Sequence, residues 1–294
     1  MPNGIILLDK PKGLTSNGAL QRVRKAYGAK SAGHVGTLDP MATGMLPLCL
    51  DEATKVIAEI ESGAKCYEFT VQLGARTDTG DAEGDIVERQ AVPALDAAVI
   101  EEMLVQFRGV QTQVPPMYSA LKRNGRPLYE LARQGVEVER AARTIDIRRL
   151  ELVAHRAGSI DLICECGKGT YIRVLGEDMA RRLGTLGFLT GLRRTWVEPF
   201  RDMPMISLEA ALAGAGTDGQ SLLAPDIALQ ALPQARLSDA QVIALRHGQA
   251  VEGSPDARVP AGGRVRMYGP DGAFLGMAEA LSDGRLQPRR LIGA

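Results

Sequence analysis

The sequence GHVGTLDPMATGMLPLCL, residues 33–50, places one aspartate in a loop that contains three glycines and two prolines. Glycine permits backbone angles that other residues avoid and proline fixes one angle, so this loop is expected to hold a single shape with Asp39 at a fixed point. The alternative is an ordinary Asp-Pro turn, in which the carboxylate bonds only its own backbone. A phosphate-binding loop is disfavoured, because both glycine-rich phosphate motifs are absent and an acid would repel a phosphate.

The segments on either side have clear periodicity. Residues 4–10, GIILLDK, are predicted to form a short buried strand. Residues 15–30 predict a helix that begins at a Thr15 or Ser16 cap and ends at Gly28. A second helix is expected from about residue 52.

The strongest strand signal is KCYEFTVQLGA, residues 65–75. Tyr67 and every second residue after it are apolar and alternate with polar ones, which is typical of a strand with one buried face. The following segments are expected, in order, to form an acidic loop (76–85), a helix closed by Gly109 (95–109), a long excursion with a short helix inside it (110–135), two strands with a bulge near Arg149 (142–155 and 158–167), and a helix capped by Thr170 and ended by Gly184 (168–184).

The pattern loosens over residues 208–235 and then changes character. Ser238 is predicted to cap a short helix, and strands are predicted to be joined at Asp271-Gly272 and Asp283-Gly284. This part is expected to be a small, separate β-rich module.

Composition sets broad limits on the function. The chain has 294 residues, of which 45% are hydrophobic and 24% charged, and no apolar run approaches the roughly 20 residues that a membrane helix needs. Its first residues lack the apolar core of a secretory signal, so we expect a cytoplasmic protein without a membrane span. The four cysteines show no disulfide framework and no C-x2-C pair, which favours reduced packing residues over a metal site.

Charge is segregated along a chain whose formal net charge is zero. Residues 76–102 carry eight acids and two arginines, whereas residues 122–149 carry eight lysines or arginines and four acids. The basic segment could follow a phosphate backbone, or it could be a solvated surface of mixed charge.

Arg173 is placed unfavourably for a cation, in the first turn of a predicted helix. The positive end of the helix dipole lies there, so Arg173 requires an anionic partner: a phosphate, a surface glutamate or Asp39. His34, His155 and His247 show neither metal-ligand spacing nor a nucleophile triad. The residues alone therefore indicate an acid-dependent enzyme that acts on a phosphorylated or polyanionic substrate.

Four motifs carry a resemblance to a known family: LLDKPKGLTSN, GHVGTLDPMATGMLPL, KCYEFTVQLGARTDTGDAEG and GKGTYIRVLGEDMARRLG. With these four motifs in this order, the sequence resembles the TruB family of tRNA pseudouridine synthases. The resemblance implies an α+β fold with a mixed, mainly antiparallel sheet and flanking helices over residues 1–235. An RNA-clasping insertion would occupy about 115–143, and a β-barrel-like PUA-type domain residues 236–294.

The resemblance also implies an activity: isomerisation of uridine to pseudouridine at position 55 in the T loop of tRNA, without metal or cofactor, by a monomeric enzyme. Asp39 matches the family's catalytic aspartate. The target nucleotide would be flipped out of the T loop, and extrusion of a loop base costs only a few kcal/mol. Asp81 matches a family motif without a firm role, an Asx turn being the alternative.

The other roles that the resemblance implies concern the substrate. Arg173 would pair with Asp39, Tyr67 would stack on the base, Tyr171 and Leu192 would close the pocket wall, His34 would fill the vacated space or brace its phosphate, and Lys10 with Pro11 would support the catalytic loop. RNA-backbone contacts are assigned to the basic residues of the insertion, namely Lys122, Arg123, Arg126, Arg133, Arg140 and Arg143.

Three other functions remain open at this point. They are a guide-dependent synthase acting on ribosomal RNA, a tRNA-binding folding chaperone with a vestigial site, and a small-molecule hydrolase. Turnover of free tRNA without a guide, and its dependence on Asp39, would separate them.

Overall fold

The computed structural model describes residues 2–123, 125–215, 222–253, 256 and 258–293. The elements of its larger part are, in chain order, β1 (Gly4–Lys10), α1 (Ser16–Tyr27), β2 (Ala32–His34), β3 (Thr43–Leu50), the 3-10 helix η1 (Asp51–Val56), α2 (Ile57–Ser62), β4 (Lys65–Leu73), β5 (Ala75–Thr77), β6 (Ile86–Arg89), α3 (Ala97–Gln106), β7 (Gly109–Gln113), β8 (Lys122–Arg123), β9 (Arg126–Pro127), α4 (Leu128–Arg133), β10 (Arg143–Arg156), β11 (Ser159–Cys166), α5 (Ile172–Arg182), β12 (Gly187–Val197), β13 (Ile206–Ser207) and α6 (Leu208–Ala213). The C-terminal elements are the 3-10 helix η2 (Pro225–Leu229), β14 (Gln234–Arg236), α7 (Asp239–Arg246), β15 (Arg264–Tyr268), β16 (Phe274–Ala280) and β17 (Leu286–Leu291).

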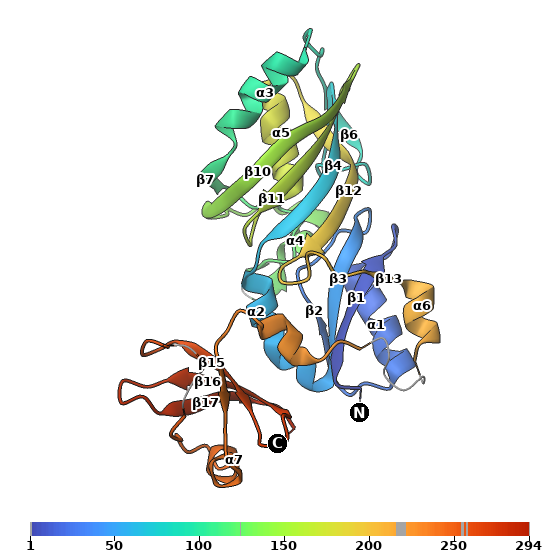
Figure 1. Cartoon of the computed structure of the whole chain (residues 1–294). Helices are drawn as coiled ribbons and strands as arrows, with labels where there is room; N and C mark the ends of the chain where they lie inside the picture. Colours follow the sequence, from blue (N-terminus) through green and yellow to red (C-terminus); the bar gives the residue numbers. More distant parts are fainter. Residues whose placement is uncertain (1, 124, 216–221, 254–255, 257, 294) are drawn as a thin grey trace.

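A nine-stranded mixed sheet forms the larger part of the molecule (Figure 1). Its order is β13-β1-β3-β12-β4-β11-β10-β7, with β2 paired to β3. Only the β1–β13 and β3–β12 pairs of this sheet are parallel. The predicted α+β fold with a mainly antiparallel sheet is therefore confirmed.

The local predictions nearest the N-terminus hold. Thr15 accepts a hydrogen bond from the Gly18 N–H and caps α1, and Gly28 ends that helix in the left-handed conformation. β1 is buried on both sides: Ile6 and Leu8 join the core under α1, whereas Ile5 and Leu7 pack with η1 and α2 on the opposite face. This explains why its sequence is a continuous apolar run without alternation.

Three expected boundaries are wrong. α5 has no side-chain cap: its N-cap residue is Tyr171, whose N–H donates to Oε1 of Gln113 on β7 at 2.8 Å, and the hydroxyl of the predicted cap Thr170 donates to the Gly167 carbonyl at 3.2 Å. α3 ends at Gln106, and Gly109 instead opens β7. The helix expected from residue 52 begins as the 3-10 helix η1 and becomes α-helical only at Ile57.

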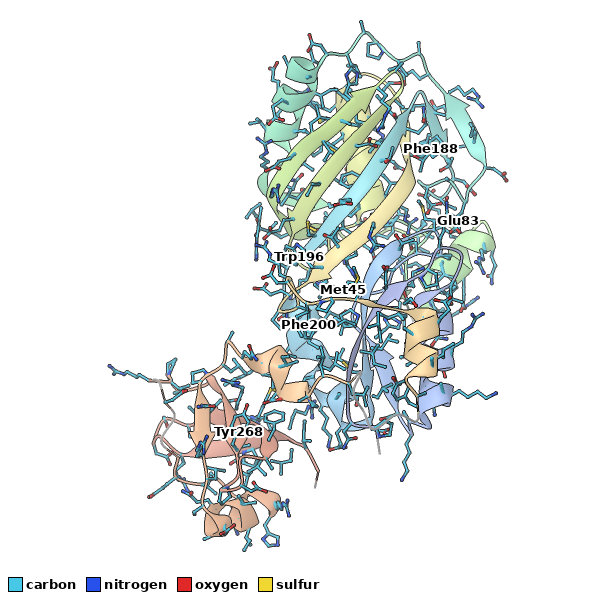
Figure 2. The ribbon with its side chains drawn as sticks, turned by 45° about the vertical axis from the view of Figure 1, so that its right-hand side comes forward. Met45, Glu83, Phe188, Trp196, Phe200 and Tyr268 are labelled. Atoms are coloured by element: carbon cyan, nitrogen blue, oxygen red, sulfur yellow. The ribbon has the colours of Figure 1, made fainter. Side chains whose placement is uncertain are left out.

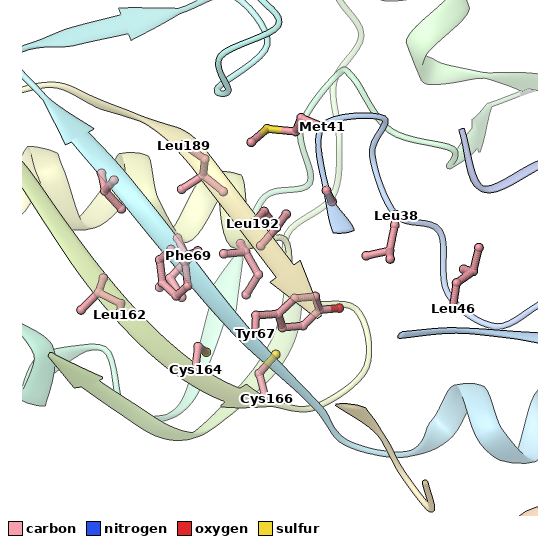
Figure 3. Close-up of a cluster of buried hydrophobic side chains, with 14 of the residues drawn as sticks. Leu38, Met41, Leu46, Tyr67, Phe69, Leu162, Cys164, Cys166, Leu189 and Leu192 are labelled. Carbon is pink, nitrogen blue, oxygen red and sulfur yellow. The ribbon is translucent and has the colours of Figure 1, made fainter. Parts of the chain in front are cut away.

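The predicted bulge near Arg149 is confirmed, since the β10–β11 register shifts between Ile147 and Arg149. All four cysteines are buried and free. Cys164 and Cys166 lie in the core on the same face of β11, as their spacing predicts (Figure 3). No helix among the described residues is long and apolar enough to cross a membrane.

The C-terminal part is an open sheet of order β14-β15-β16-β17, and the β-barrel expected there is not closed. Four short strands are too few to curl into a closed barrel around a core. Ser238 caps α7 as predicted, with a full capping box. The predicted boundary at 235/236 stays a prediction, although β14 already pairs with β15 from Gln234 onward.

The C-terminal sheet contacts the rest of the chain along η1, α2 and η2. The Lys55 ammonium donates to the Leu291 carbonyl at 2.7 Å, and Arg264 pairs with Glu59. Met277 packs into the same apolar cluster as Phe200, and the Tyr268 hydroxyl donates to Asp226 at 2.8 Å. Phe200 and Tyr268 are labelled in Figure 2.

The large sheet has a narrow seam between its two halves. β3 and β12 pair over only two positions, where Thr43 lies beside Arg193 and Gly44 beside Arg194. Arg193 also donates two hydrogen bonds to the Asp9 carboxylate, at 2.9 and 2.8 Å, and so joins β12 to β1. The loop from residue 35 to 42 begins and ends at this seam.

Candidate active site

The loop that carries Asp39 rises from the β2–β3 hairpin. The Val35 N–H donates to the Pro47 carbonyl at 2.9 Å, which closes the base of the loop. Ser16 at the start of α1 exchanges hydrogen bonds with the Leu38 backbone at 2.8 and 2.9 Å. The residue before the aspartate is thus fixed from both directions, and the loop has the definite shape that its composition predicts.

Asp39 forms a two-point ion pair with Arg173. The Arg173 Nε lies 2.9 Å from Oδ2 of Asp39, and Nη2 donates to Oδ1 at 3.3 Å. The same guanidinium donates to the carbonyls of Thr79 and Tyr118, both at 2.6 Å. Its side chain is 5% exposed and that of Asp39 32%, so the arginine is fixed from behind while the carboxylate reaches open space.

This pairing resolves both questions that the sequence raised. The cation at the start of α5 has its anionic partner, which offsets the unfavourable dipole. The Asp-Pro turn alternative is wrong for the side chain, because the carboxylate of Asp39 binds Arg173 across 134 residues of sequence.

Two opposing effects set the acidity of Asp39. Burial raises the pKa of its carboxyl above the ordinary value, because the charged form loses water, and the negative charge of Asp81 adds to this. Arg173 lowers the pKa by its charge and its hydrogen bond, and Lys10 by its charge, without cancelling the rise.

A pocket of about 660 Å³ opens in front of the ion pair. Six predicted residues line it: Asp39, Tyr67, Arg143, Tyr171, Arg173 and Leu192. Figure 3 shows Tyr67 and Leu192 on neighbouring strands, with the Tyr67 hydroxyl directed away from Phe69. Burial raises the pKa of Tyr67 to about 12, against the opposing charge of Arg194, so its hydroxyl is protonated at neutral pH. The pocket combines an aromatic and an aliphatic wall with one carboxylate, which suits a flat base attached to a sugar.

Comparisons with known proteins agree with this geometry. Residues 24–172 match the model described as TruB family pseudouridylate synthase (N terminal domain), and residues 233–292 match Pseudouridine synthase II TruB, C-terminal. The chain is 47% identical over 294 residues to a tRNA pseudouridine synthase B of Burkholderia mallei, covering 99% of this chain and 97% of that protein. The chain belongs to the TruB family of pseudouridine synthases.

Two more comparisons extend this result. The tRNA pseudouridine synthase B of Stutzerimonas stutzeri is 48% identical over 295 residues, covering 99% of this chain and 95% of that protein. A solved Cbf5-Nop10-Gar1 complex contains a chain with a TM-score of 0.76 and 24% identity, covering 99% of this chain and 85% of that one, which shows a shared fold. This TruB-family chain is thus an isomerase, and the sequence-based recognition of its family is confirmed.

Asp81, whose role the sequence left open, lies behind the ion pair of this TruB-family site. Its Oδ2 is 3.7 Å from Nε of Arg173. Its Oδ1 accepts from the Thr79 hydroxyl at 2.7 Å and from the Glu83 N–H at 3.0 Å, which is the local bonding of an Asx turn. Asp81 therefore forms the Asx turn that was the alternative, and it also adds a second carboxylate beside Arg173.

Lys10 and His34 lie outside the pocket lining. The Lys10 ammonium is fully buried and donates to the carbonyls of Pro11, Leu14 and Pro40, at 2.9, 2.6 and 3.3 Å. This geometry agrees with support of the catalytic loop; direct contact with substrate stays a prediction. Burial and the charge of Arg194 lower the pKa of His34, which favours a neutral imidazole at pH 7.

The buried ammonium predicts a pH dependence of stability. Burial lowers the pKa of Lys10 from 10.5 to about 8 in the folded chain, so between these two values the unfolded chain binds more protons. The free energy of unfolding that this site contributes should therefore rise with pH over that window. Denaturant titrations of the unmodified chain and of Lys10→Met, from pH 7 to 10, should show a stability deficit of the variant that grows with pH. A deficit that is the same at every pH would contradict this assignment.

The basic insertion residues lie on exposed or half-buried surface. Lys122, Arg123, Arg126 and Arg133 are exposed on β8, β9 and α4. Arg140 and Arg143 are half-buried, and Arg143 lies 4.5 Å from the ring centroid of Tyr171 and lines the pocket. Arg143 therefore lies at the pocket itself, although the sequence predicted that it contacts the RNA backbone.

Sequence reasoning missed two buried cations that also line the pocket. Lys65 donates to the carbonyls of Glu61 and Gly63 at 2.9 and 2.8 Å, and Arg194 is 1% exposed. One available signal was the spacing of Leu192 and Arg194, which places both on one face of a strand. That signal is visible only once residues 187–197 are recognised as a strand.

Proposed function

We propose that this chain converts uridine to pseudouridine in tRNA, at position 55 of the T loop, after the nucleotide has been flipped into the pocket. The observation that supports this most directly is the Asp39–Arg173 pair at the mouth of a pocket walled by Tyr67 and Leu192. The naming of the relatives that share 47 to 48% of its residues supports tRNA as the substrate.

The reaction balances without any co-reactant. The bond from C1′ of the ribose to N1 of uracil breaks, the base rotates, and C1′ joins C5; the proton on C5 leaves and a proton occupies N1. Asp39 would begin this sequence either by bonding covalently to the sugar or base, or by removing a proton from the ribose. The enclosing walls would retain the detached base while it turns, which keeps the recombination intramolecular.

The Arg173 guanidinium would keep the carboxylate aimed at the sugar, since two of its nitrogens meet both oxygens of Asp39. Tyr67 would stack on the base and assist in removing the C5 proton. Tyr171 also lines the pocket, and Arg143 packs against its ring.

The test is a reaction of purified protein with unmodified transcribed tRNA and no other component. We expect pseudouridine at position 55 and none in a tRNA that carries cytidine there. An isolated T stem-loop should also be a substrate, because the pocket takes a single nucleotide. Product that forms only after a guide RNA is added would overturn the proposal in favour of the guide-dependent alternative.

Exposed cations on β8 and β9 should govern affinity for tRNA. Reversal of Lys122 and Arg126 to Glu is expected to raise KM and to reduce the slope of log affinity against log salt by about 2, one for each phosphate that is no longer neutralised. Filter binding and initial rates at several salt concentrations would measure this. The matched control reverses Arg22 and Lys25, exposed cations of α1 outside the pocket and the insertion, and should leave KM unchanged. An unchanged KM in the insertion variant would contradict the RNA-clasping role.

The remaining parts of the proposal concern assembly and location. The chain is proposed to act as a monomer. Sedimentation at the concentrations used for the assay would test this. A tRNA substrate supports placement in the cytoplasm.

A further inference from the structure

Arg194 is a fully buried cation whose charge is met by backbone carbonyls. Its Nε donates to the Met45 carbonyl at 2.7 Å, and its Nη2 donates to the carbonyls of Val35 and Gly36 at 3.0 and 3.1 Å. Among the described residues no carboxylate forms an ion pair with it, although its neighbour Arg193 pairs with Asp9. A charge kept 1% exposed in this way needs several well-placed oxygens, so its position is narrowly fixed.

The three carbonyls flank the loop that carries Asp39. Val35 and Gly36 precede the aspartate and Met45 follows it, so one guanidinium joins the two ends of the loop. The donor of these bonds, Arg194, is on β12, whereas the loop connects β2 to β3. The bonds therefore fix both ends of the loop to β12.

Two of the three glycines in residues 33–50, Gly36 and Gly44, fit closely against Arg194. A Cβ on Gly36, where φ is +65°, would lie 2.8 Å from Nη1 of Arg194. A Cβ on Gly44, where φ is +98°, would lie 2.2 Å from the Arg194 carbonyl oxygen. Gly36 and Gly44 are the first and last residues of the pattern G-x-L-D-x-x-x-x-G, and this pattern has a structural reason: a side chain at either glycine would collide with Arg194.

Arg194 also lines the pocket, together with Tyr67 and Leu192. Arg194 lies across from Tyr67 in the β12–β4 register and is two residues after Leu192 on the same strand. Arg194 is therefore on β12, the strand that carries Leu192. This strand pairs with β4, the strand that carries Tyr67.

We propose that Arg194 is a positioning residue for the isomerisation, one that sets where the Asp39 carboxylate stands relative to a base held between Tyr67 and Leu192. The inference rests on the proposed function of this pocket. A displacement of about 1 Å between a reacting group and its substrate can cost about 100-fold in rate, so a residue that fixes this separation should act mainly on the chemical step.

The experiment compares Arg194→Met and Arg194→Lys with the unmodified chain in single-turnover reactions with excess enzyme, alongside the Kd for tRNA. We expect the Met variant to react about 100-fold more slowly with little change in Kd. The Lys variant keeps the charge but lacks the fork that reaches both ends of the loop, so it should recover part of the rate.

Arg193→Met is the matched control, because it removes the adjacent arginine of the same strand and an ion pair to β1. It should keep the single-turnover rate. A Met variant at position 194 that is folded and reacts at the unmodified rate would overturn the inference, as would equal losses at positions 193 and 194.

A second variant covers the case in which Arg194→Met does not fold. Gly36→Ala disturbs the same contact from the loop side. We expect a slower rate, and in the double variant with Arg194→Lys the combined loss should be smaller than the product of the two single losses, because both changes disturb one contact. Losses that multiply fully, or a folded Gly36→Ala with the unmodified rate, would overturn the inference.

The unmodified chain separates the two proposals. If it forms no pseudouridine in tRNA, the proposed function fails and the role of Arg194 fails with it. If it is active and the variants of Arg194 and Gly36 match it, only the positioning role fails.

Discussion

The Asp39→Asn variant is expected to form no pseudouridine while binding tRNA as tightly as the unmodified chain. Asparagine has the shape of aspartate and can still accept a hydrogen bond from Arg173, but it can act neither as a nucleophile nor as a base. The single-turnover rate should fall by about 10⁴-fold or more, the scale seen when the group that performs the chemistry is removed. Mass spectrometry of the reacted tRNA and filter binding would measure the two effects separately.

The control for this prediction is Asp85→Asn, an exposed carboxylate in the acidic loop between β5 and β6. It removes the same charge from an exposed position outside the pocket lining and should leave both rate and binding unchanged. Retained turnover in Asp39→Asn would remove Asp39 from its role. Loss of turnover together with tRNA binding would instead indicate a damaged fold.

Replacement of Arg173 by Met is expected to give the second largest effect, on both rate and pH profile. Asp39 would keep its buried position but lose the cation and hydrogen bonds that lower its pKa. Since the ionised carboxylate is the reactive form, the acid limb of the rate profile should move to higher pH. At neutral pH we expect a loss of about 10² to 10³-fold, because the carboxylate is also no longer aimed.

The Arg173→Lys variant separates charge from geometry. It keeps a cation beside Asp39 but loses the fork that bonds both carboxylate oxygens and the carbonyls of Thr79 and Tyr118. Its acid limb should therefore lie closer to that of the unmodified chain, while its rate stays reduced. An acid limb in Arg173→Met that coincides with the unmodified one, or lies at lower pH, would contradict the proposed control of Asp39.

Breaking a buried pair also affects stability. Arg173→Met leaves the carbonyls of Thr79 and Tyr118 without their donor and Asp39 without its cation, which should cost about 3 kcal/mol or more in the free energy of unfolding. Kinetic measurements on this variant therefore belong at a temperature well below its melting point, verified by circular dichroism.

Several elements could be predicted because their causes are local. The alternation in β4 depends only on which face of one strand is buried, and the Thr15 cap of α1 depends on a side chain three residues from its donor. Arg173 was conspicuous for the same reason, because the dipole of its own helix made a lone cation there unfavourable. The sequence could indicate that an anion was needed; the family motifs indicated which.

The errors arose where the deciding partner is distant in the chain. The N–H of Tyr171, the residue before α5, donates to Gln113, which is 58 residues away, so no local pattern could show that the helix starts after Tyr171 without a Thr170 cap. The closure of the C-terminal sheet depends on strand number and curvature, which turn residues such as Asp271-Gly272 do not encode.

By itself the sequence determined the parts that carry chemistry: a rigid loop with one aspartate, a cation needing an anion, and the family to which both belong. The tertiary structure alone decided that Arg194 of β12 joins both ends of that loop and that Asp81 reinforces the arginine. The reason is physical: hydrophobic alternation and capping are properties of neighbouring residues, whereas a buried charge is defined by whichever distant carbonyls or carboxylates the folded chain brings to it.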